Sequence, residues 1–160
     1  MAEPSRGLLD TSVVIDLASI DPDRLPDEAA VAAITLAELA AGPHATSDAD
    51  EAARRQDRLQ WVAATWETLA FDADAARAYG RVFAAVRGAG RSNRPRLADL
   101  LVAATAISNG LPVYTRNVDD FKALKGLVEV FGVRGSPLRP MGSMSSEEAP
   151  RCLRTRIPSG

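Results

Sequence analysis

Four carboxylates in this chain stand where they could act together, although long stretches of sequence separate them. They are Asp10, Glu38, Asp99 and one member of the pair Asp119 and Asp120. Carboxylates crowded into one crevice raise each other's pKa, and they stay ionised when a cation lies among them. An all-oxygen ligand set suits Mg²⁺ or Mn²⁺, and one or two such ions can activate a water for phosphodiester hydrolysis. The residue types therefore indicate a metal-dependent nuclease or phosphatase.

Zinc is disfavoured, because the sequence holds one histidine and one cysteine and zinc sites are built mainly from those residues.

Asp99 poses the sharpest question, because it lies in the apolar stretch "RLADLLVAATAIS". This stretch favours a helix that is apolar nearly all round, which is typical of a helix buried between other layers. An ionised carboxylate there is costly unless it is paired, hydrogen-bonded or bound to a metal. The simplest partner would be an arginine, since Arg94 and Arg96 come just before it.

The elements that must position these acids are predicted to alternate between strands and helices. Asp72 is predicted to cap its helix, and Thr11 or Ser12 to cap the first one. This alternation predicts an α/β fold with a parallel sheet of about five strands, covered by helices on both faces. The expected strands are 6–10, the first part of 29–43, 66–71, 111–115 and 127–132. One expected helix begins at residue 11, and the others cover 35–41, 48–64, 72–86 and 97–110.

The candidate acids follow the rule that ligands bind outside the carboxyl ends of parallel strands. Asp10 ends the first predicted strand, and Glu38 lies just past the second. Asp119 and Asp120 follow the fourth strand within "TRNVDDF", and Asp99 begins the helix that leads into that strand. We therefore expect the acids to converge on one crevice. Asp16, six residues after Asp10, is interpreted as a solvated or capping acid.

Composition bounds the remaining possibilities. With 160 residues, 46% of them hydrophobic, the chain suits one globular domain over 1–134. The net charge of −2 means that binding to nucleic acid would need a local basic patch.

From Gly135 the sequence is rich in Ser, Pro, Gly and Arg, so we expect 135–160 to form a disordered or extended tail, in part a non-native cloning remnant. No apolar run approaches the roughly 20 residues of a membrane span, and no signal peptide is recognisable, so a soluble, cytoplasmic protein is expected.

Three segments together resemble the VapC-like toxins of the PIN-domain ribonuclease family. They are "LLDTSVVIDL", "ITLAELAAG" and "RLADLLVAATAISNGLPVYTRNVDDF", and the resemblance runs from about Gly7 to Gly132. It implies a PIN-like three-layer α/β/α fold and a Mg²⁺- or Mn²⁺-dependent endoribonuclease. It also implies inhibition by a VapB-like antitoxin, a homodimer, and a structured RNA of translation, transfer or ribosomal, as substrate.

The resemblance also assigns residues by motif. Asp10, Glu38, Asp99 and Asp120 match the acids that hold the metal, with Asp119 an open alternative to Asp120. On this basis Asp99 is a metal ligand rather than the partner of an arginine. Three further positions match polar residues that support the acids, with hydroxyls that hold water or metal and an amide that braces the site; they are Ser12, Thr115 and Asn117.

Basic residues near Asp99 are the candidates for binding RNA. Arg94 and Arg96 precede the helix that carries Asp99, so they can reach phosphates next to the scissile bond.

Two other functions remain open. A layered phosphatase would use Asp10 as nucleophile, but it would normally carry a second aspartate where this chain has Ser12. A degenerate PIN domain would bind RNA without cutting it, and the presence of all four acids argues against that.

Overall fold

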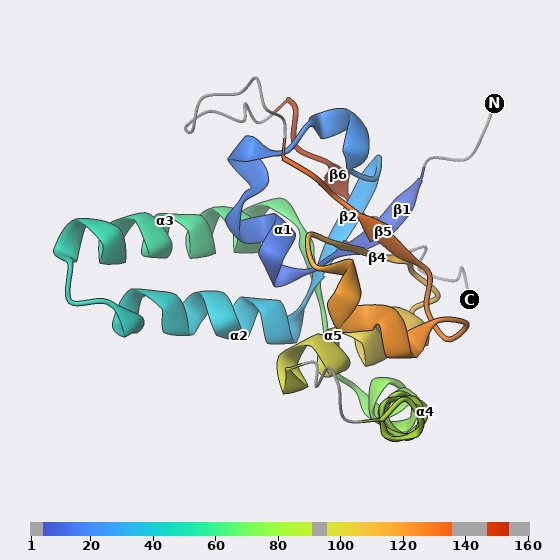
Figure 1. Cartoon of the computed structure of the whole chain (residues 1–160). Helices are drawn as coiled ribbons and strands as arrows, with labels where there is room; N and C mark the ends of the chain where they lie inside the picture. The colour runs from blue at the N-terminus through green and yellow to red at the C-terminus, as the bar shows by residue number, and fades with distance from the viewer. Residues whose placement is uncertain (1–4, 91–95, 136–146, 154–160) are drawn as a thin grey trace, which may run out of the picture.

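The architecture comes from a computed structural model, which describes residues 5–90, 96–135 and 147–153. A parallel sheet lies at the centre with the strand order β3-β2-β1-β4-β5, and β6 pairs with β2 beside β3 (Figure 1). The expected parallel sheet of about five strands is confirmed. The strands are β1 Arg6–Leu9, β2 Glu28–Ala32, β3 Glu67–Leu69, β4 Val113–Thr115, β5 Val130–Gly132 and β6 Arg151–Cys152.

Helices connect the strands close to the positions that the sequence predicts. Asp72 caps α4 as expected, because its Oδ1 accepts a hydrogen bond from the Ala75 amide at 2.9 Å. Short 3₁₀ turns supplement the helices, and one of them, η4 (Val118–Leu124), carries Asp119 and Asp120. The α-helices are α1 Thr11–Ile15, α2 Ala33–Ala41, α3 Ala49–Thr65, α4 Ala73–Gly88 and α5 Leu97–Ser108.

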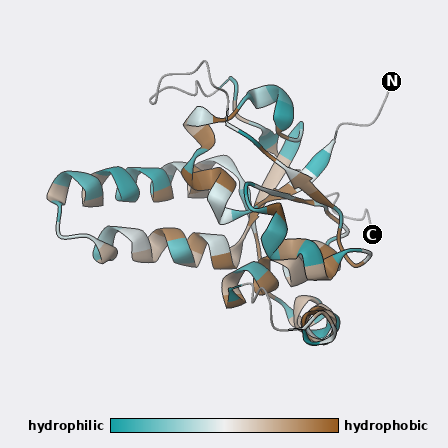
Figure 2. Ribbon diagram, in the orientation of Figure 1, coloured by the Kyte–Doolittle hydropathy of each residue, from teal (hydrophilic) through white to brown (hydrophobic). Residues whose placement is uncertain are grey.

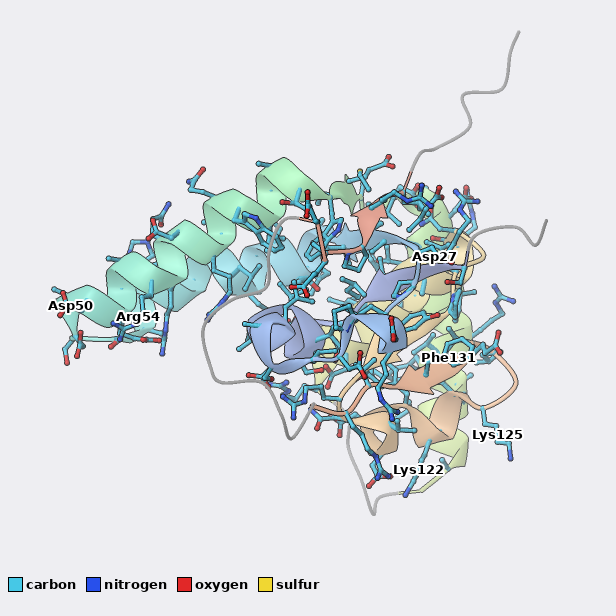
Figure 3. All side chains as sticks on the ribbon, turned by 90° about the horizontal axis from the view of Figure 1, so that it is seen from above. Asp27, Asp50, Arg54, Lys122, Lys125 and Phe131 are labelled. Carbon is cyan, nitrogen blue, oxygen red and sulfur yellow. The ribbon has the colours of Figure 1, made fainter. Side chains whose placement is uncertain are left out.

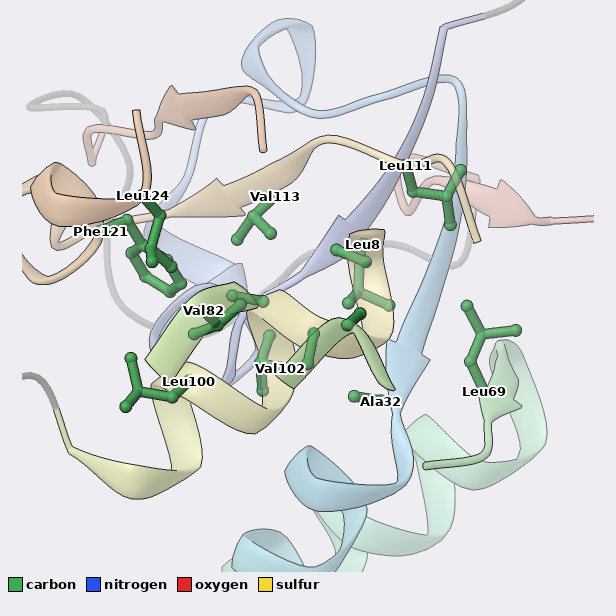
Figure 4. Packing of buried hydrophobic residues seen from close by; sticks show 14 of the residues in the cluster. Leu8, Ala32, Leu69, Val82, Leu100, Val102, Leu111, Val113, Phe121 and Leu124 are labelled. Atoms are coloured by element: carbon green, nitrogen blue, oxygen red, sulfur yellow. The ribbon is translucent and has the colours of Figure 1, made fainter. Parts of the chain in front are cut away.

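Two hydrophobic cores lie on opposite faces of the sheet and define three layers. One core joins α4, α5 and η4 to the strands, and Figure 4 shows Val82 and Val102 of the helices near Val113 and Leu8 of the strands, with Phe121 beside Leu124. The other joins α1 and α3 to the opposite face. In Figure 2, hydrophobic residues gather where helices meet strands, while hydrophilic residues dominate α3. The expected three-layer α/β/α fold is confirmed.

Strand β1 occupies the middle of the sheet and delivers Asp10 to its carboxyl edge. Its register pairs Leu9 with Val31 of β2 and with Tyr114 of β4. Leu8 and Leu9 are fully buried in opposite cores, as the alternation of side chains along a strand requires. The residue that follows therefore emerges between two neighbouring strands, at the edge where ligands bind in parallel sheets.

Helix α5 is buried as the sequence predicts. Val102, Ala103, Ala104 and Ala106 are fully buried, and the small side chains allow α4 to pack closely along it. Rigid support of this kind holds the first turn of α5, and with it Asp99, at a fixed place beside the end of β1.

Residues 147–153 differ from the disordered or extended tail that we expected. Strand β6 pairs in parallel with Glu28 and Ala29 of β2, and Leu153 is buried in the core shared with α4 and α5. The indole N–H of buried Trp66 donates to the Pro150 carbonyl at 2.8 Å. A short polar sequence predicts no such strand, because its partners come from distant parts of the chain. Residues 136–146 and 154–160 lie outside the described residues.

Among the described residues, no helix combines the length and the apolar character needed to cross a bilayer.

Candidate active site

Asp10 is held in place by two hydroxyl groups. It is buried at the end of β1, and its Oδ2 accepts hydrogen bonds from Ser12 Oγ at 2.8 Å and Thr115 Oγ1 at 2.9 Å. The Arg116 amide donates to Ser12 Oγ at 3.1 Å, and the Asn117 amide donates to Thr115 Oγ1 at 3.0 Å. Both hydroxyls are therefore oriented with their protons toward the carboxylate. Ser12 and Thr115 lie beside the acid, as expected, and Asn117 contributes its backbone.

The prediction that Thr11 or Ser12 caps α1 is wrong. Asp10 occupies the N-cap position and makes no side-chain capping bond. The Ser12 hydroxyl binds Asp10 instead, and the Thr11 hydroxyl donates to Glu38 at 2.7 Å. Strand β1 ends at Leu9 and α1 begins at Thr11, so Asp10 takes the N-cap position and both hydroxyls lie inside the first turn, where they donate to carboxylates.

Asp99 is the most exceptional side chain of the site. It is 4% exposed, and its Oδ2 has no hydrogen-bond partner among the described residues. Arg96 Nε lies 3.7 Å from Oδ2, too far for a hydrogen bond, and the Arg96 side chain is 71% exposed. Burial raises the pKa of Asp99 to about 6, with further increases from the charges of Asp10 and Asp120 that Arg96 offsets only in part. The arginine partner therefore leaves this carboxyl largely uncompensated.

Asp119 and Asp120 have different surroundings. The charge of Asp120 raises the pKa of Asp99, so Asp120 lies toward the centre of the site, and it is half-buried. Asp119 is 69% exposed and forms a 2.6 Å ion pair with Lys122 on the surface of η4. The geometry thus favours Asp120 over Asp119 as the fourth acid.

Glu38 stands apart from the other three acids. Its Oε1 accepts the hydrogen bond of Thr11, whose hydroxyl lies 3.0 Å from that of fully buried Thr35. Glu38 lines a separate hollow of about 340 Å³ between α1, α2 and α3, together with Arg55 and Arg58. Thr11 and Thr35 are site residues that were not predicted from the sequence. The signal available was the spacing of Thr35, three residues before Glu38 and therefore on the same face of α2.

The donor set fits a hard cation, although the side chains are not yet arranged around one. Within the described residues, no three His, Cys, Asp or Glu side chains stand together so that they could hold an ion as they are. Asp10, Asp99 and Asp120 nevertheless supply only oxygen, and one buried oxygen of Asp99 accepts no hydrogen bond from the part of the chain that the structure describes. Such an oxygen, next to a second buried carboxylate, suits Mg²⁺ or Mn²⁺.

The structure describes one of the two arginines that are predicted to bind RNA. Arg94 lies outside the described residues. Arg96 is exposed at the N-terminus of α5, beside Asp99. Two charged residues that were not predicted to belong to the site, Arg116 and Asp16, form an ion pair across its rim.

Comparison with known proteins identifies the class to which this arrangement belongs. Residues 7–127 match the PIN domain, and this range holds β2, β3, β4, nearly all of β1, helix α5 and every acid described above. The chain therefore belongs to the PIN-domain family.

Within that family the chain is similar to VapC ribonucleases. It is 42% identical to ribonuclease VapC5 of Mycobacterium tuberculosis over 82% of this chain and 96% of the relative. Ribonuclease VapC4 of the same organism is 34% identical over 71% and 88%. In the crystal structure of VapBC-5, a toxin–antitoxin system of M. tuberculosis, one chain is 44% identical and superposes with a TM-score of 0.73. That match covers 81% of this chain and all of the solved one.

Proposed function

We propose that this chain is a Mg²⁺- or Mn²⁺-dependent endoribonuclease, the toxin of a VapBC-type toxin–antitoxin pair. The observation that carries the proposal is the buried oxygen of Asp99 that accepts no hydrogen bond from the described residues, next to Asp10 and Asp120 at the carboxyl edge of a parallel sheet. The names of the relatives, VapC ribonucleases, support cleavage of RNA. A structured RNA of translation, transfer or ribosomal, is the substrate that we propose.

The chain's own residues divide the work of the reaction. Asp10, Asp99 and Asp120 would hold the metal, and Glu38 would join them after it turns away from Thr11. When bound, the ion supplies the charge that activates water and stabilises the leaving oxygen. Ser12 and Thr115 orient Asp10 through their hydrogen bonds. Arg96 would contact a phosphate of the substrate. Hydrolysis joins a water oxygen to phosphorus and releases the other strand fragment, whose oxygen takes up a proton.

The experiment that tests this function is incubation of the purified chain with total RNA and Mg²⁺, Mn²⁺ or a chelator. We expect cleavage with either metal and none with the chelator. Asp10→Asn should abolish cleavage, whereas Asp119→Asn, which alters an exposed ion pair, should cut RNA as the parent does. Binding of RNA without any cleavage would indicate instead a domain that has lost catalysis.

The partners follow from the same proposal. The relative VapBC-5 is described as a toxin–antitoxin system, so we expect a VapB-like antitoxin to place a segment across the crevice and an arginine among the carboxylates. We also expect a homodimer, the commonest assembly of soluble proteins. Sedimentation that shows monomer at micromolar concentration would argue against the dimer.

A further inference from the structure

A second hollow adjoins the acids on the side of η4 and β5. It has a volume of about 800 Å³ and is open to solvent. Asp120 belongs to its wall as well as to the surroundings of Asp99, so the hollow and the acid site are continuous. Its size lies within the range of about 300–1,000 Å³ that is typical of small-molecule sites. The lining consists of Arg96, Arg116, Asn117, Val118, Asp119, Asp120, Gly132, Val133 and Arg134.

Arginines outnumber aspartates three to two in the lining of this hollow. Asp119 is paired with Lys122 at 2.6 Å, while Arg116 is paired with Asp16 and Arg96 lies 3.7 Å from Asp99. Arg96, Arg116 and Arg134 come from three different elements and enclose the same space. Because the chain as a whole carries a net charge of −2, three arginines around one hollow stand out as a site for an anion.

Arg116 is held in position and still has donors to spare. Its Nη1 donates to Asp16 Oδ2. Its Nη2 lies close to Gly135, 3.7 Å from the position that a Cβ atom would occupy on that residue. The Arg116 amide also anchors Ser12, the residue that orients Asp10. A guanidinium has five N–H donors, so the ion pair with Asp16 leaves most of them available. The Arg116 side chain is 32% exposed, which keeps part of it accessible.

Arg134 is the complementary case, an exposed arginine that forms no ion pair with the described carboxylates. In the part of the chain that the structure describes, no Asp or Glu oxygen forms an ion pair with it. Val133, the preceding residue, is buried and bonds to β4 through its amide, which donates to Thr115 O at 2.8 Å. The backbone that carries Arg134 is thus fixed to the same strand that supports Asp10.

We infer that this hollow is a subsite for the RNA backbone next to the scissile phosphate, with Arg116 and Arg134 as its phosphate-binding residues. The inference rests on the proposed ribonuclease function and deepens it. A strand whose scissile phosphate lies at Asp10 and Asp99 passes Asp120 and enters the hollow, where the next phosphate meets the two guanidinium groups. Arginine suits this role because its planar fork can bind phosphate oxygens with two hydrogen bonds. Neither residue contacts the reacting atoms, so both are substrate-positioning residues.

The test measures binding of RNA separately from cleavage. The probe is a fluorescein-labelled single-stranded RNA of mixed sequence, titrated in Mg²⁺ with chains that carry Asp99→Asn, so that the RNA stays intact. Adding Arg116→Gln and Arg134→Gln should raise the Kd about tenfold for each arginine, as expected for charge-assisted hydrogen bonds. The slope of log K against log salt should also fall by about 1.4, since two phosphate contacts to a single strand are lost.

The matched control removes two charges elsewhere. Arg54 and Arg77 are exposed and ion-paired on their own helices, with Glu51 and Asp74, and Arg54 lies toward the far end of α3 (Figure 3). Arg54→Gln/Arg77→Gln should change the Kd less than about twofold. Because Arg116→Gln also breaks an ion pair, Arg134→Gln alone is measured as well, and its melting temperature should match that of the parent.

The outcomes separate the inference from the function on which it rests. If the parent chain cuts RNA while the Arg116/Arg134 double variant binds it as tightly as the control, the inference is wrong and the ribonuclease function stands. If the parent neither binds nor cuts RNA, both are wrong. A loss of Mn²⁺ affinity equal to the loss of RNA affinity would also overturn the inference, because it would make the arginines supports of the acid site.

Discussion

Asp99 and Glu38 are both acids at the carboxyl edge of the sheet, and the chain treats them in opposite ways. Glu38 has a hydroxyl partner, Thr11, at 2.7 Å, and a fully buried threonine stands behind that hydroxyl. Asp99 is more deeply buried and keeps an oxygen that accepts no hydrogen bond in the described part of the molecule, with Arg96 Nε 3.7 Å away. Burying an ionised carboxylate oxygen without a hydrogen bond costs free energy, and apolar packing around it does not compensate for this cost. On the proposed function, this difference means that Asp99 can receive the metal directly, whereas Glu38 must first leave its hydrogen bond with Thr11.

The largest expected effect follows directly from this comparison. On the proposed function, Asp99→Asn should reduce RNA cleavage about a thousandfold, because it removes a ligand of the metal that activates water. Mn²⁺ affinity, measured by calorimetric titration, should fall further in Asp99→Asn than in Glu38→Gln, since Glu38 must first give up Thr11 to bind metal. Equal losses of Mn²⁺ affinity in the two variants would remove the distinction between the two acids.

The next effect concerns the two neighbouring acids of η4. Asp120→Asn should weaken Mn²⁺ binding by about ten- to a hundredfold, in the range found when groups that support a metal site are lost. Asp119→Asn should leave it unchanged, because Asp119 is exposed and engaged with Lys122. The same calorimetric titration decides between them, and a larger loss for Asp119→Asn would reverse the assignment of the fourth acid.

A third effect appears in the stability of the metal-free chain. The pKa of Asp99 is about 6 in the folded chain and near 3.8 in the unfolded chain. The folded chain therefore binds a proton at Asp99 more tightly than the unfolded chain does. The ionised form therefore lowers the free energy of unfolding above about pH 6, and this penalty disappears below about pH 4. Asp99→Asn should be more stable than the parent by about 3 kcal/mol at pH 7.5 in chelator.

Urea unfolding at several pH values measures this difference. The advantage of Asp99→Asn should shrink steadily as the pH falls from 6 to 4. A constant difference across that range would show that burial of the charge is not its cause.

The smallest effect tests how Glu38 is held. Thr11→Val keeps the shape of a buried side chain but removes the hydroxyl that binds Glu38, so the free energy of unfolding should fall by about 2 kcal/mol. Thr11→Ser restores the hydroxyl and should recover most of this loss. Thermal unfolding compares the two, and equal stability of both variants would show that the hydrogen bond to Glu38 contributes nothing.

These comparisons also show which parts of the structure could be predicted from the sequence. The strands, the buried helix α5 and the cap at Asp72 depend on periodicity and local residue types, so the sequence predicts them well. Strand β6 depends on Trp66 and β2, which no local pattern in Arg151 and Cys152 reveals. The order of the acids along the sheet edge follows from topology. The choice of Thr11 as partner of Glu38 follows from side-chain packing, whereas local residue types predicted a helix cap for that hydroxyl.

Strand β6 has a consequence for how this molecule is made on the ribosome. Synthesis proceeds from the N-terminus, so β1, β2 and all the acids are translated before Arg151 and Cys152. β3 pairs with Ala30–Ala32 of β2, and β6 pairs with Glu28 and Ala29. Until β6 is translated, Glu28 and Ala29 present an open strand edge, the kind of edge to which other chains add. The nascent chain therefore carries its complete set of carboxylates during an interval in which its sheet is not yet closed on that side.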